Sequence, residues 1–258
     1  MKASELSPFS IGIMGGSGAL QLLDARDGFV VTTPWGDPSS EITQVTVGAC
    51  VVPQAAWMIQ RHGNPHRIPP HRVNYRANLW ALKEAGVRHV IAINAVGGIR
   101  PNFLPADLVL VDQLIDYTWG RAHTYSDGPD QPLVHCEFGE PYHGPMRSAL
   151  IEAGERCGVG MHLEGCYGAT QGPRLETEAE IRRMARDGCD VVGMTGMPEA
   201  GLARELGLDY ACLCVVANPA AGIGGEPISL EELYEVLATA MGKVGQLLSH
   251  LPDPEQFA

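Results

Sequence analysis

Four arginines and three histidines are crowded into residues 61 to 76, a segment without any Asp or Glu: Arg61, Arg67, Arg72, Arg76, His62, His66 and His71. The chain as a whole is acidic, with a net charge of −12. Because guanidinium groups hold phosphate and carboxylate by paired hydrogen bonds, this basic segment favours a small anionic ligand. Solvated arginines with partners elsewhere in the fold would explain it equally well. The overall charge argues against a nucleic-acid partner, which needs a basic surface.

The histidines and cysteines do not have the spacing of a metal site. His62, His66 and His71 share a proline-rich loop, and neither an H-E-x-x-H nor a C-x-x-C pattern occurs. The seven cysteines are scattered and odd in number, which is typical of reduced thiols rather than of a disulfide scaffold. Cys212 and Cys214 lie two apart in an apolar run, so we expect both on one face of a buried strand. We predict no metal.

The chain shows no sign of a membrane or secretory protein. No apolar stretch reaches the roughly 18 residues of a membrane-spanning helix. Residues 1–10 contain one Lys and no apolar core of the kind that a signal peptide needs. We therefore expect a cytoplasmic protein without a membrane partner.

Four glycine-rich or polar segments follow apolar runs where strands are expected to end. The first is neither a dinucleotide fingerprint nor a P-loop, because neither glycine spacing fits. Ligands in open α/β sheets bind outside the carboxyl ends of the strands, so the last three segments, together with the basic segment of residues 61 to 76, favour a site for an anion and a small molecule. Each segment alone is equally compatible with an ordinary connecting loop. The segments are Gly15-Gly16-Ser17-Gly18, Asn94-Ala95-Val96-Gly97-Gly98, Gly193-Met194-Thr195-Gly196 and Ala217-Asn218-Pro219-Ala220.

Helices and buried strands alternate in the second part of the chain. Three expected helices end near residues 85, 187 and 206, each just before a glycine, and an apolar run follows each glycine. A last helix is expected after Ser229, which has capping-box spacing to Glu232. Residues 11–60 are instead rich in strand-forming and turn residues. We predict a single α/β domain over residues 1–258, with a mixed, largely parallel sheet flanked by helices.

Several ordered motifs resemble the trimeric purine nucleoside phosphorylase and methylthioadenosine phosphorylase family. This resemblance extends from about residue 11 to 248 and implies the family's fold, a homotrimer, and cleavage of a purine nucleoside by inorganic phosphate, with no cofactor. The motifs are Gly15-Gly16-Ser17-Gly18, Arg61-His62-Gly63, Asn74-Tyr75-Arg76-Ala77-Asn78, Ala95-Val96-Gly97-Gly98, Gly172-Pro173-Arg174-Leu175-Glu176-Thr177, Met194-Thr195 and Pro198-Glu199.

The resemblance also implies roles for individual residues. The predicted phosphate contacts are Ser17, Arg61, His62, Ala95 and Thr195. Met194 is expected beneath the ribose, and His135 aligns with a histidine that the family contributes from a neighbouring subunit. Catalysis in such a site depends on orientation and electrostatics, without a covalent intermediate.

The residues expected to read the base differ from those of the methylthioadenosine phosphorylases. Those relatives carry two aspartates where this chain has Asn218 and Ala220, whereas the 6-oxopurine phosphorylases pair a glutamate at the position of Glu176 with an asparagine at that of Asn218. Hypoxanthine offers an N1–H that Glu176 can accept and an O6 to which the Asn218 amide can donate. We therefore predict Glu176 and Asn218 as catalytic residues that bind a 6-oxopurine. The alternative is that Glu176 only caps the following helix.

The sugar end of the site is expected to be apolar. Leu230, Leu233 and Tyr234 stand where ordinary 6-oxopurine phosphorylases place a histidine near the 5′-hydroxyl, and they resemble a wall that holds a methylthio group. Leu175 replaces an aromatic residue that packs on the base, and Asn94 replaces a threonine of the phosphate loop. The predicted substrate is 5′-methylthioinosine. The alternatives are a general 6-oxopurine nucleoside phosphorylase, a methylthioadenosine phosphorylase and, more remotely, a non-catalytic nucleoside-binding module.

Overall fold

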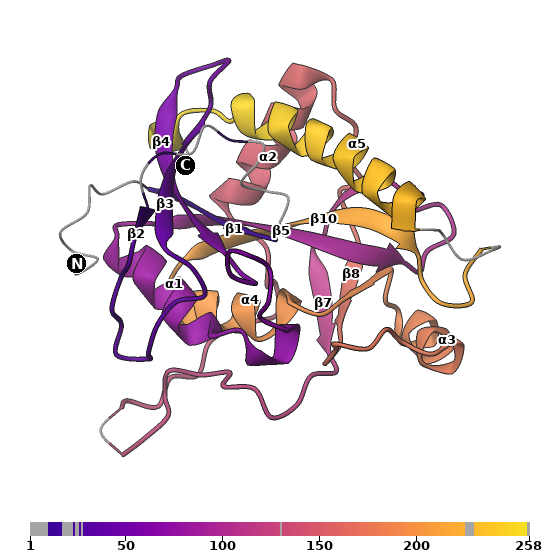
Figure 1. Cartoon of the computed structure of the whole chain (residues 1–258), viewed down its shortest axis with the longest axis horizontal. Coiled ribbons are helices and arrows are strands. Elements are labelled where there is room, and N and C mark those ends of the chain that lie inside the picture. Colours follow the sequence, from indigo (N-terminus) through magenta and orange to yellow (C-terminus); the bar gives the residue numbers. More distant parts are fainter. Residues whose placement is uncertain are drawn as a thin grey trace.

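A mixed sheet crosses the molecule, and helices cover both of its faces (Figure 1). The computed structural model describes residues 10–16, 23, 26, 28–129, 131–224 and 230–256, excepting the side chains of residues 230, 231, 233 and 234. The strands are β1 (Ile11–Gly15), β2 (Gly28–Phe29), β3 (Ile42–Val47), β4 (Gln54–Gln60), β5 (His89–Gly98), β6 (Leu108–Leu110), β7 (Gln113–Asp116), β8 (Cys166–Ala169), β9 (Val191–Gly193) and β10 (Asp209–Pro219).

The central strands run parallel to one another. Strands β4, β1, β5 and β10 pair in parallel, and so do β7, β8 and β9. Antiparallel pairs attach β2, β3 and β6 and join β5 to β9. The predicted mixed α/β sheet is confirmed, and the carboxyl ends of β1, β4, β5 and β10 meet at one edge, where open α/β sheets bind ligands.

In the described part of the chain, five α-helices surround the sheet. Helices α1 (Tyr75–Glu84) and α4 (Gly196–Glu205) cover one face, and α2 (Pro145–Cys157) and α5 (Leu230–Ser249) cover the other (Figure 1). Helix α3 (Glu178–Asp187) packs beside the end of β9. Short 3-10 turns lie at Pro70–Arg72 and Pro254–Gln256.

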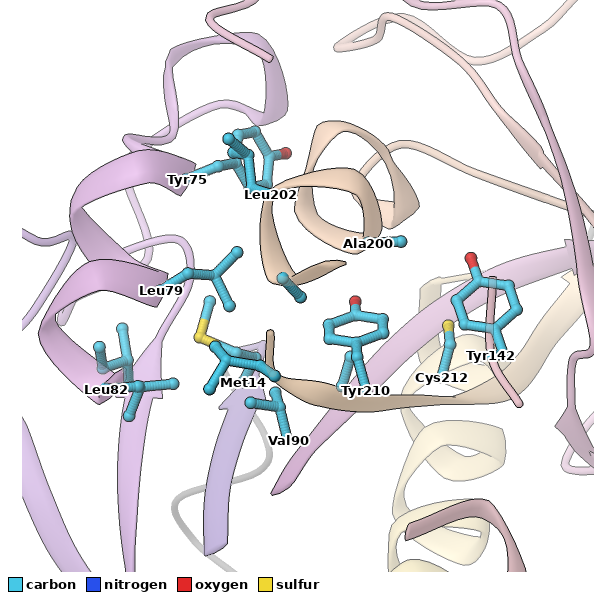
Figure 2. Packing of buried hydrophobic residues seen from close by; sticks show 14 of the residues in the cluster. Met14, Tyr75, Leu79, Leu82, Val90, Tyr142, Ala200, Leu202, Tyr210 and Cys212 are labelled. Atoms are coloured by element: carbon cyan, nitrogen blue, oxygen red, sulfur yellow. The ribbon is translucent and has the colours of Figure 1, made fainter. Parts of the chain in front are cut away.

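Successive side chains of the central strands point alternately into two separate hydrophobic cores. On β10, Cys212 and Cys214 face the α1 and α4 side, while Leu213 faces α2 and α5. Figure 2 shows the first core, in which Leu79 of α1 and Leu202 of α4 pack above the sheet. Both strand faces are buried, which explains the continuous apolar runs of the sequence. Each fully buried leucine contributes roughly 1.5–3 kcal/mol to folding.

Glycines end three helices where the sequence predicted. Gly86, Gly188 and Gly207 have φ values of 89°, 97° and 69°, the left-handed conformation that glycine adopts without strain. At the other end of α1, the Asn74 side chain accepts a hydrogen bond from the backbone of Ala77 at 3.1 Å. Ser229 lies outside the described residues, so the capping box proposed for α5 stays a prediction.

The predictions for the cysteines also stand. All seven cysteines carry free thiols. Cys212 and Cys214 are fully buried on one face of β10, with their sulfur atoms 3.7 Å apart. Within the described part of the chain, no helix is long and apolar enough to cross a membrane.

Candidate active site

Arg61 links three of the elements that meet at the sheet edge. It follows β4 directly, and its backbone N–H donates to the Gly15 carbonyl at the end of β1. Its guanidinium is 1% exposed and donates to the carbonyls of Met14 (3.2 Å) and Ile93 (3.3 Å). The Nε and Nη2 atoms each donate to the Glu199 carboxylate of α4 at 2.7 Å.

These contacts engage four of the five N–H groups of Arg61. Burial alone would lower the pKa of Arg61, but the facing Glu199 carboxylate raises it above its ordinary value. The Nε and Nη2 edge of the guanidinium, which could hold an anion by two parallel hydrogen bonds, is thus occupied by Glu199. One N–H of Nη1 has no acceptor among the described residues. Arg61 can offer phosphate a single fixed donor, and its role as a phosphate contact stays a prediction.

Glu199 and Tyr210 complete a buried polar network that the sequence did not reveal. Glu199 is fully buried, and its Oε1 accepts both from Arg61 and from the Tyr210 hydroxyl at 2.8 Å. Tyr210 stands on β10 with its hydroxyl directed towards α4 (Figure 2). Only the Pro198-Glu199 motif drew attention to this region, and it gave Glu199 no role.

His62 is held as a neutral ring. Its Nδ1 lies 2.8 Å from the Ile68 carbonyl, which can only accept, so Nδ1 carries the proton. The ring stacks on His66 with centroids 4.4 Å apart. Burial, together with the nearby charge of Arg61, lowers the pKa of His62 to about 4. A neutral His62 with a bare Nε2 can accept a proton or hydrogen bond from phosphate, but it adds no positive charge.

This depressed pKa leads to a pH prediction. In the unfolded chain His62 binds a proton near its ordinary pKa of 6.5, whereas in the folded chain it does so only near pH 4. As the pH falls through this window the unfolded state binds more protons, so the stability contribution of neutral His62 is lost. We expect the free energy of unfolding, measured in urea, to fall more between about pH 7 and 5 in the wild type than in His62→Asn.

The matched control is His143→Asn, which replaces an exposed histidine. This variant should follow the wild type. An NMR titration in which the His62 ring protonates near its ordinary pKa would contradict the prediction.

Ala95 lies on β5 and Thr195 directly precedes α4, and Arg61 contacts both of these elements. Ala95 is exposed although Asn94 and Val96 on either side are buried, so this part of β5 borders open space. Thr195 precedes α4 and is 6% exposed, and its side chain does not cap the helix. Arg61 contacts Ile93, two residues before Ala95, and Glu199, four residues after Thr195. Ala95 and Thr195 thus lie close in sequence to partners of Arg61, and their common role in binding phosphate stays a prediction. Ser17 lies outside the described residues.

Close packing explains part of the glycine-rich segment after β9. A Cβ at Gly193 would lie 2.1 Å from the Tyr167 hydroxyl oxygen, so only glycine fits there. That hydroxyl accepts hydrogen bonds from the backbones of Thr195 and Gly196, each at 3.3 Å. Tyr167 thereby fixes the turn that presents Thr195.

The other three arginines of the basic segment have different surroundings from Arg61. Arg76 pairs with Asp127 at 2.7 Å and lies over the Trp35 ring. Arg67 and Arg72 are exposed. For these three arginines, the solvated or otherwise paired interpretation is the better one.

Glu176 does not cap helix α3. Thr177 is the N-cap, and its side chain and that of Glu180 form a reciprocal capping box, so the alternative role for Glu176 is wrong. The Oε1 of Glu176 instead accepts a hydrogen bond from the Thr170 hydroxyl at 2.6 Å. Thr170, buried at the end of β8, is a second residue that the sequence did not point to.

Asn218 and Ala220 have different surroundings at the end of β10. Asn218 pairs with Gly97 of β5 after a register shift and is half-buried. Ala220 is 5% exposed and packs in an apolar cluster with Ile181, Met184 and Val192. The structure therefore places Asn218 at the sheet edge and Ala220 within the packing beneath it.

Two tight contacts join the base-reading segments to the sugar side. Gly222, with φ of 74°, lies so close to α3 that a Cβ would approach Cγ of Glu178 to 2.8 Å. Gly172, with φ of 58°, leaves the space in which the Met194 sulfur lies, because a Cβ there would be 2.5 Å from that atom. The turn after Asn218 and residue Met194 thus both border the segment that carries Glu176.

Other predicted residues lie apart or outside the description. Leu175 is 75% exposed. His135 is exposed on the long segment between β7 and α2, which extends away from the sheet (Figure 1). Leu230, Leu233 and Tyr234 open α5, but their side chains are not among those described.

Within the described residues, no group of three or more His, Cys, Asp or Glu side chains could hold a metal ion. The expectation that phosphate is the only co-substrate stays a prediction. The chemistry that the site can perform is the binding of a small anion beside a polar edge for a base.

Comparison with known proteins places this geometry in a family. The phosphorylase superfamily matches residues 10–251. The chain is 48% identical over 245 residues to a "Probable S-methyl-5'-thioinosine phosphorylase" of Xanthomonas campestris pv. campestris, covering 94% of this chain and 96% of that one. It is 43% identical over 233 residues to the 6-oxopurine nucleoside phosphorylase of Pyrococcus furiosus, covering 88% and 86%. The solved methylthioadenosine phosphorylase of Schistosoma mansoni in complex with adenine superposes with a TM-score of 0.84 at 33% identity, covering 93% and 90%. The chain belongs to the phosphorylase superfamily.

Proposed function

We propose that the protein cleaves 5′-methylthioinosine with inorganic phosphate, yielding hypoxanthine and 5-methylthioribose 1-phosphate. The bond between C1′ and N9 breaks, and a phosphate oxygen forms the new bond to C1′. The purine leaves with the electron pair of the broken bond and takes up a proton. The protein contributes by orienting phosphate and by stabilising the charge that develops on the purine.

The observation that carries the proposal is the state of the Glu176 carboxylate. One of its oxygens accepts from Thr170, and Thr177 rather than Glu176 caps α3. The other oxygen can accept the N1–H of a 6-oxopurine. Adenine would instead present a lone pair at N1 to this carboxylate. The amide nitrogen of the half-buried Asn218 donates one hydrogen bond to the Pro219 carbonyl at 2.7 Å, and its second N–H can donate to O6.

The phosphate side supports the same reaction. Arg61 follows β4 and binds both β5, the strand of Ala95, and α4, the helix that Thr195 precedes. The charge of Arg61 is balanced by Glu199, and His62 is neutral. Fixed hydrogen-bond donors, rather than a surplus of positive side chains, would then hold phosphate under C1′.

The preference for a 5′-methylthio group is supported by the relatives that share nearly half of the residues of this chain. A second candidate is a general 6-oxopurine nucleoside phosphorylase, favoured by the relative from Pyrococcus furiosus. Both candidates use Glu176 and Asn218 in the same way, so they differ only in what fills the space at the 5′ position.

A substrate panel tests the proposal. Methylthioinosine, methylthioadenosine, inosine and adenosine are each incubated with and without phosphate, and release of free base is measured. We expect phosphate-dependent cleavage with the highest kcat/KM for methylthioinosine. Equal rates for inosine would support the general 6-oxopurine enzyme, and a preference for methylthioadenosine would overturn the proposed base reading. Base binding without turnover would leave only a binding module.

We further propose a cytoplasmic homotrimer in which His135 reaches a neighbour's site. His135 is exposed, and Leu133 and Val134 beside it are apolar and 74% and 47% exposed. Such an exposed apolar segment is typical of a surface that another subunit covers.

Mixing two weakened variants tests this arrangement. Arg61→Ala and His135→Ala subunits, mixed under conditions that exchange subunits, should form intact sites in about a quarter of the positions if the two residues come from different subunits. We expect activity above the sum of the separate variants. No gain after exchange, or a monomer in gel filtration, would contradict a shared site.

A further inference from the structure

Arg121 is an arginine that neither the sequence nor the family motifs singled out. It is 8% exposed and lies after β7, at the beginning of the long segment that carries His135. Its five N–H groups reach six acceptors, all of them neutral oxygen atoms. These are the carbonyls of Thr170 (3.1 Å), Gln171 (2.8 Å), Met194 (2.8 Å) and Met197 (2.5 Å), the side-chain oxygen of Gln171 (3.2 Å) and the hydroxyl of Tyr75 (3.4 Å).

The acceptors belong to both halves of the candidate site. Thr170 holds the Glu176 carboxylate, and Gln171 starts the segment that leads to Glu176. Met194 and Met197 lie on either side of Thr195, at the beginning of α4, which carries Glu199. Nη2 binds the first segment and Nη1 binds the second, so one rigid planar group sets the distance between them.

We propose that Arg121 is a positioning residue that holds the base-reading segment, residues 170–176, in register with the turn of residues 194–197 beside the phosphate site. The proposal rests on the phosphorolysis proposed above. Arg121 itself touches neither substrate; it fixes backbone carbonyls, so that Glu176 and Thr195 stand at the right separation for one nucleoside and one phosphate.

The chemistry of the guanidinium suits this task better than an ammonium group would. A lysine has three donors that diverge from one point, whereas the five N–H donors of an arginine lie in one plane and point away from its different edges. A shift of about 1 Å in either segment would misplace the base against the phosphate, which typically lowers the rate by about 100-fold. A merely structural arginine would change stability without changing the reaction of the folded enzyme.

The chain offers a matched control in Arg147. Its guanidinium also binds backbone carbonyls, those of Leu110, Val111 and Leu163, and it is half-buried. These carbonyls lie at the end of β6 and before β8, on segments that carry none of the predicted site residues.

The experiment compares Arg121→Ala, Arg121→Lys, Arg147→Ala and Arg147→Lys in the full-length protein. Urea unfolding reports stability, and initial rates at saturating phosphate report kcat and KM for methylthioinosine and methylthioadenosine. We expect kcat/KM for methylthioinosine to fall about 100-fold in both Arg121 variants and less than about threefold in both Arg147 variants at similar losses of stability. The ratio of kcat/KM for methylthioinosine over methylthioadenosine should fall only in the Arg121 variants.

Guanidinium ion provides the readout that a structural role would not move. At low millimolar concentration it should raise the activity of Arg121→Ala at least about tenfold. The activity of Arg147→Ala should not change. Three outcomes would each overturn the proposal. They are equal losses of kcat/KM in the two pairs of variants, no rescue by guanidinium, and an Arg121→Lys protein that fails to fold while Arg147→Lys folds. A wild type that cleaves no nucleoside would reject the proposed function instead, and calorimetric binding of hypoxanthine to the same variants would then still test Arg121.

Discussion

Replacing Arg61 by alanine is expected to raise the KM for phosphate and to lower kcat/KM by about 100-fold or more, because loss of a desolvated charged donor typically costs about 2–5 kcal/mol. The same change leaves the fully buried Glu199 carboxylate without its cation. An uncompensated buried charge destabilises a protein by about 3–5 kcal/mol. Arg61→Ala therefore combines a loss of function with a loss of stability.

The double variant Arg61→Ala/Glu199→Gln separates the two effects. Removing the charge at position 199 should recover much of the free energy of unfolding, measured in urea, while the KM for phosphate stays high. Arg76→Ala is the control from the same basic segment, since its ion pair with Asp127 is solvent-exposed on one side and contributes at most about 1 kcal/mol. A double variant with a normal phosphate KM would restrict Arg61 to holding Glu199.

The second large effect concerns the choice of purine. Sites built around substrate hydrogen bonds discriminate by roughly 10⁴-fold, because the wrong ligand leaves buried groups unpaired. Glu176→Gln combined with Asn218→Asp should reverse the pattern of donors and acceptors at the base edge. We expect the ratio of kcat/KM for methylthioinosine over methylthioadenosine to fall by about 10³-fold or more, mostly through loss of methylthioinosine cleavage.

Glu178→Gln is the matched control for this change, because Glu178 lies two residues beyond Glu176, is exposed, and pairs only loosely with Arg182 at 3.5 Å. Its ratio should equal that of the wild type. A ratio unmoved by the double substitution would show that Glu176 and Asn218 do not read the purine 6-position.

Local signals predicted the ends of three helices and the apolar strands that follow them, but not helix α2 or strands β6, β7 and β8. Gly86, Gly188 and Gly207 follow helices because the left-handed backbone conformation at these positions is open mainly to glycine. A glycine directly after a helical pattern can therefore be recognised from the local sequence. The order of the strands could not be predicted in the same way. Strand β10 pairs with β5 more than a hundred residues earlier, and no local pattern encodes such a pairing.

The candidate site divides along the same line. The family motifs located Arg61, Glu176 and Asn218. The residues that position Arg61 and the segment leading to Glu176 lie far from them in the sequence. Glu199 lies 138 residues beyond Arg61, and Arg121 binds carbonyls 49 to 76 residues away. Every residue has a backbone carbonyl, so the sequence does not show which carbonyls accept hydrogen bonds from Arg121. The role of such a residue can be recognised only in the folded chain.

The burial of Ala220 bears on how purine preference can change during evolution. The family resemblance implies an aspartate at this position in the adenine-specific relatives, whereas here the methyl group fills a cluster with Ile181, Met184 and Val192 and leaves 5% of the residue exposed. A carboxylate introduced there first would meet apolar neighbours and remain unpaired, which is costly. A lineage moving towards adenine would therefore have to shrink a neighbour such as Ile181 before acquiring the aspartate. Packing around Ala220 would then constrain the order of such substitutions.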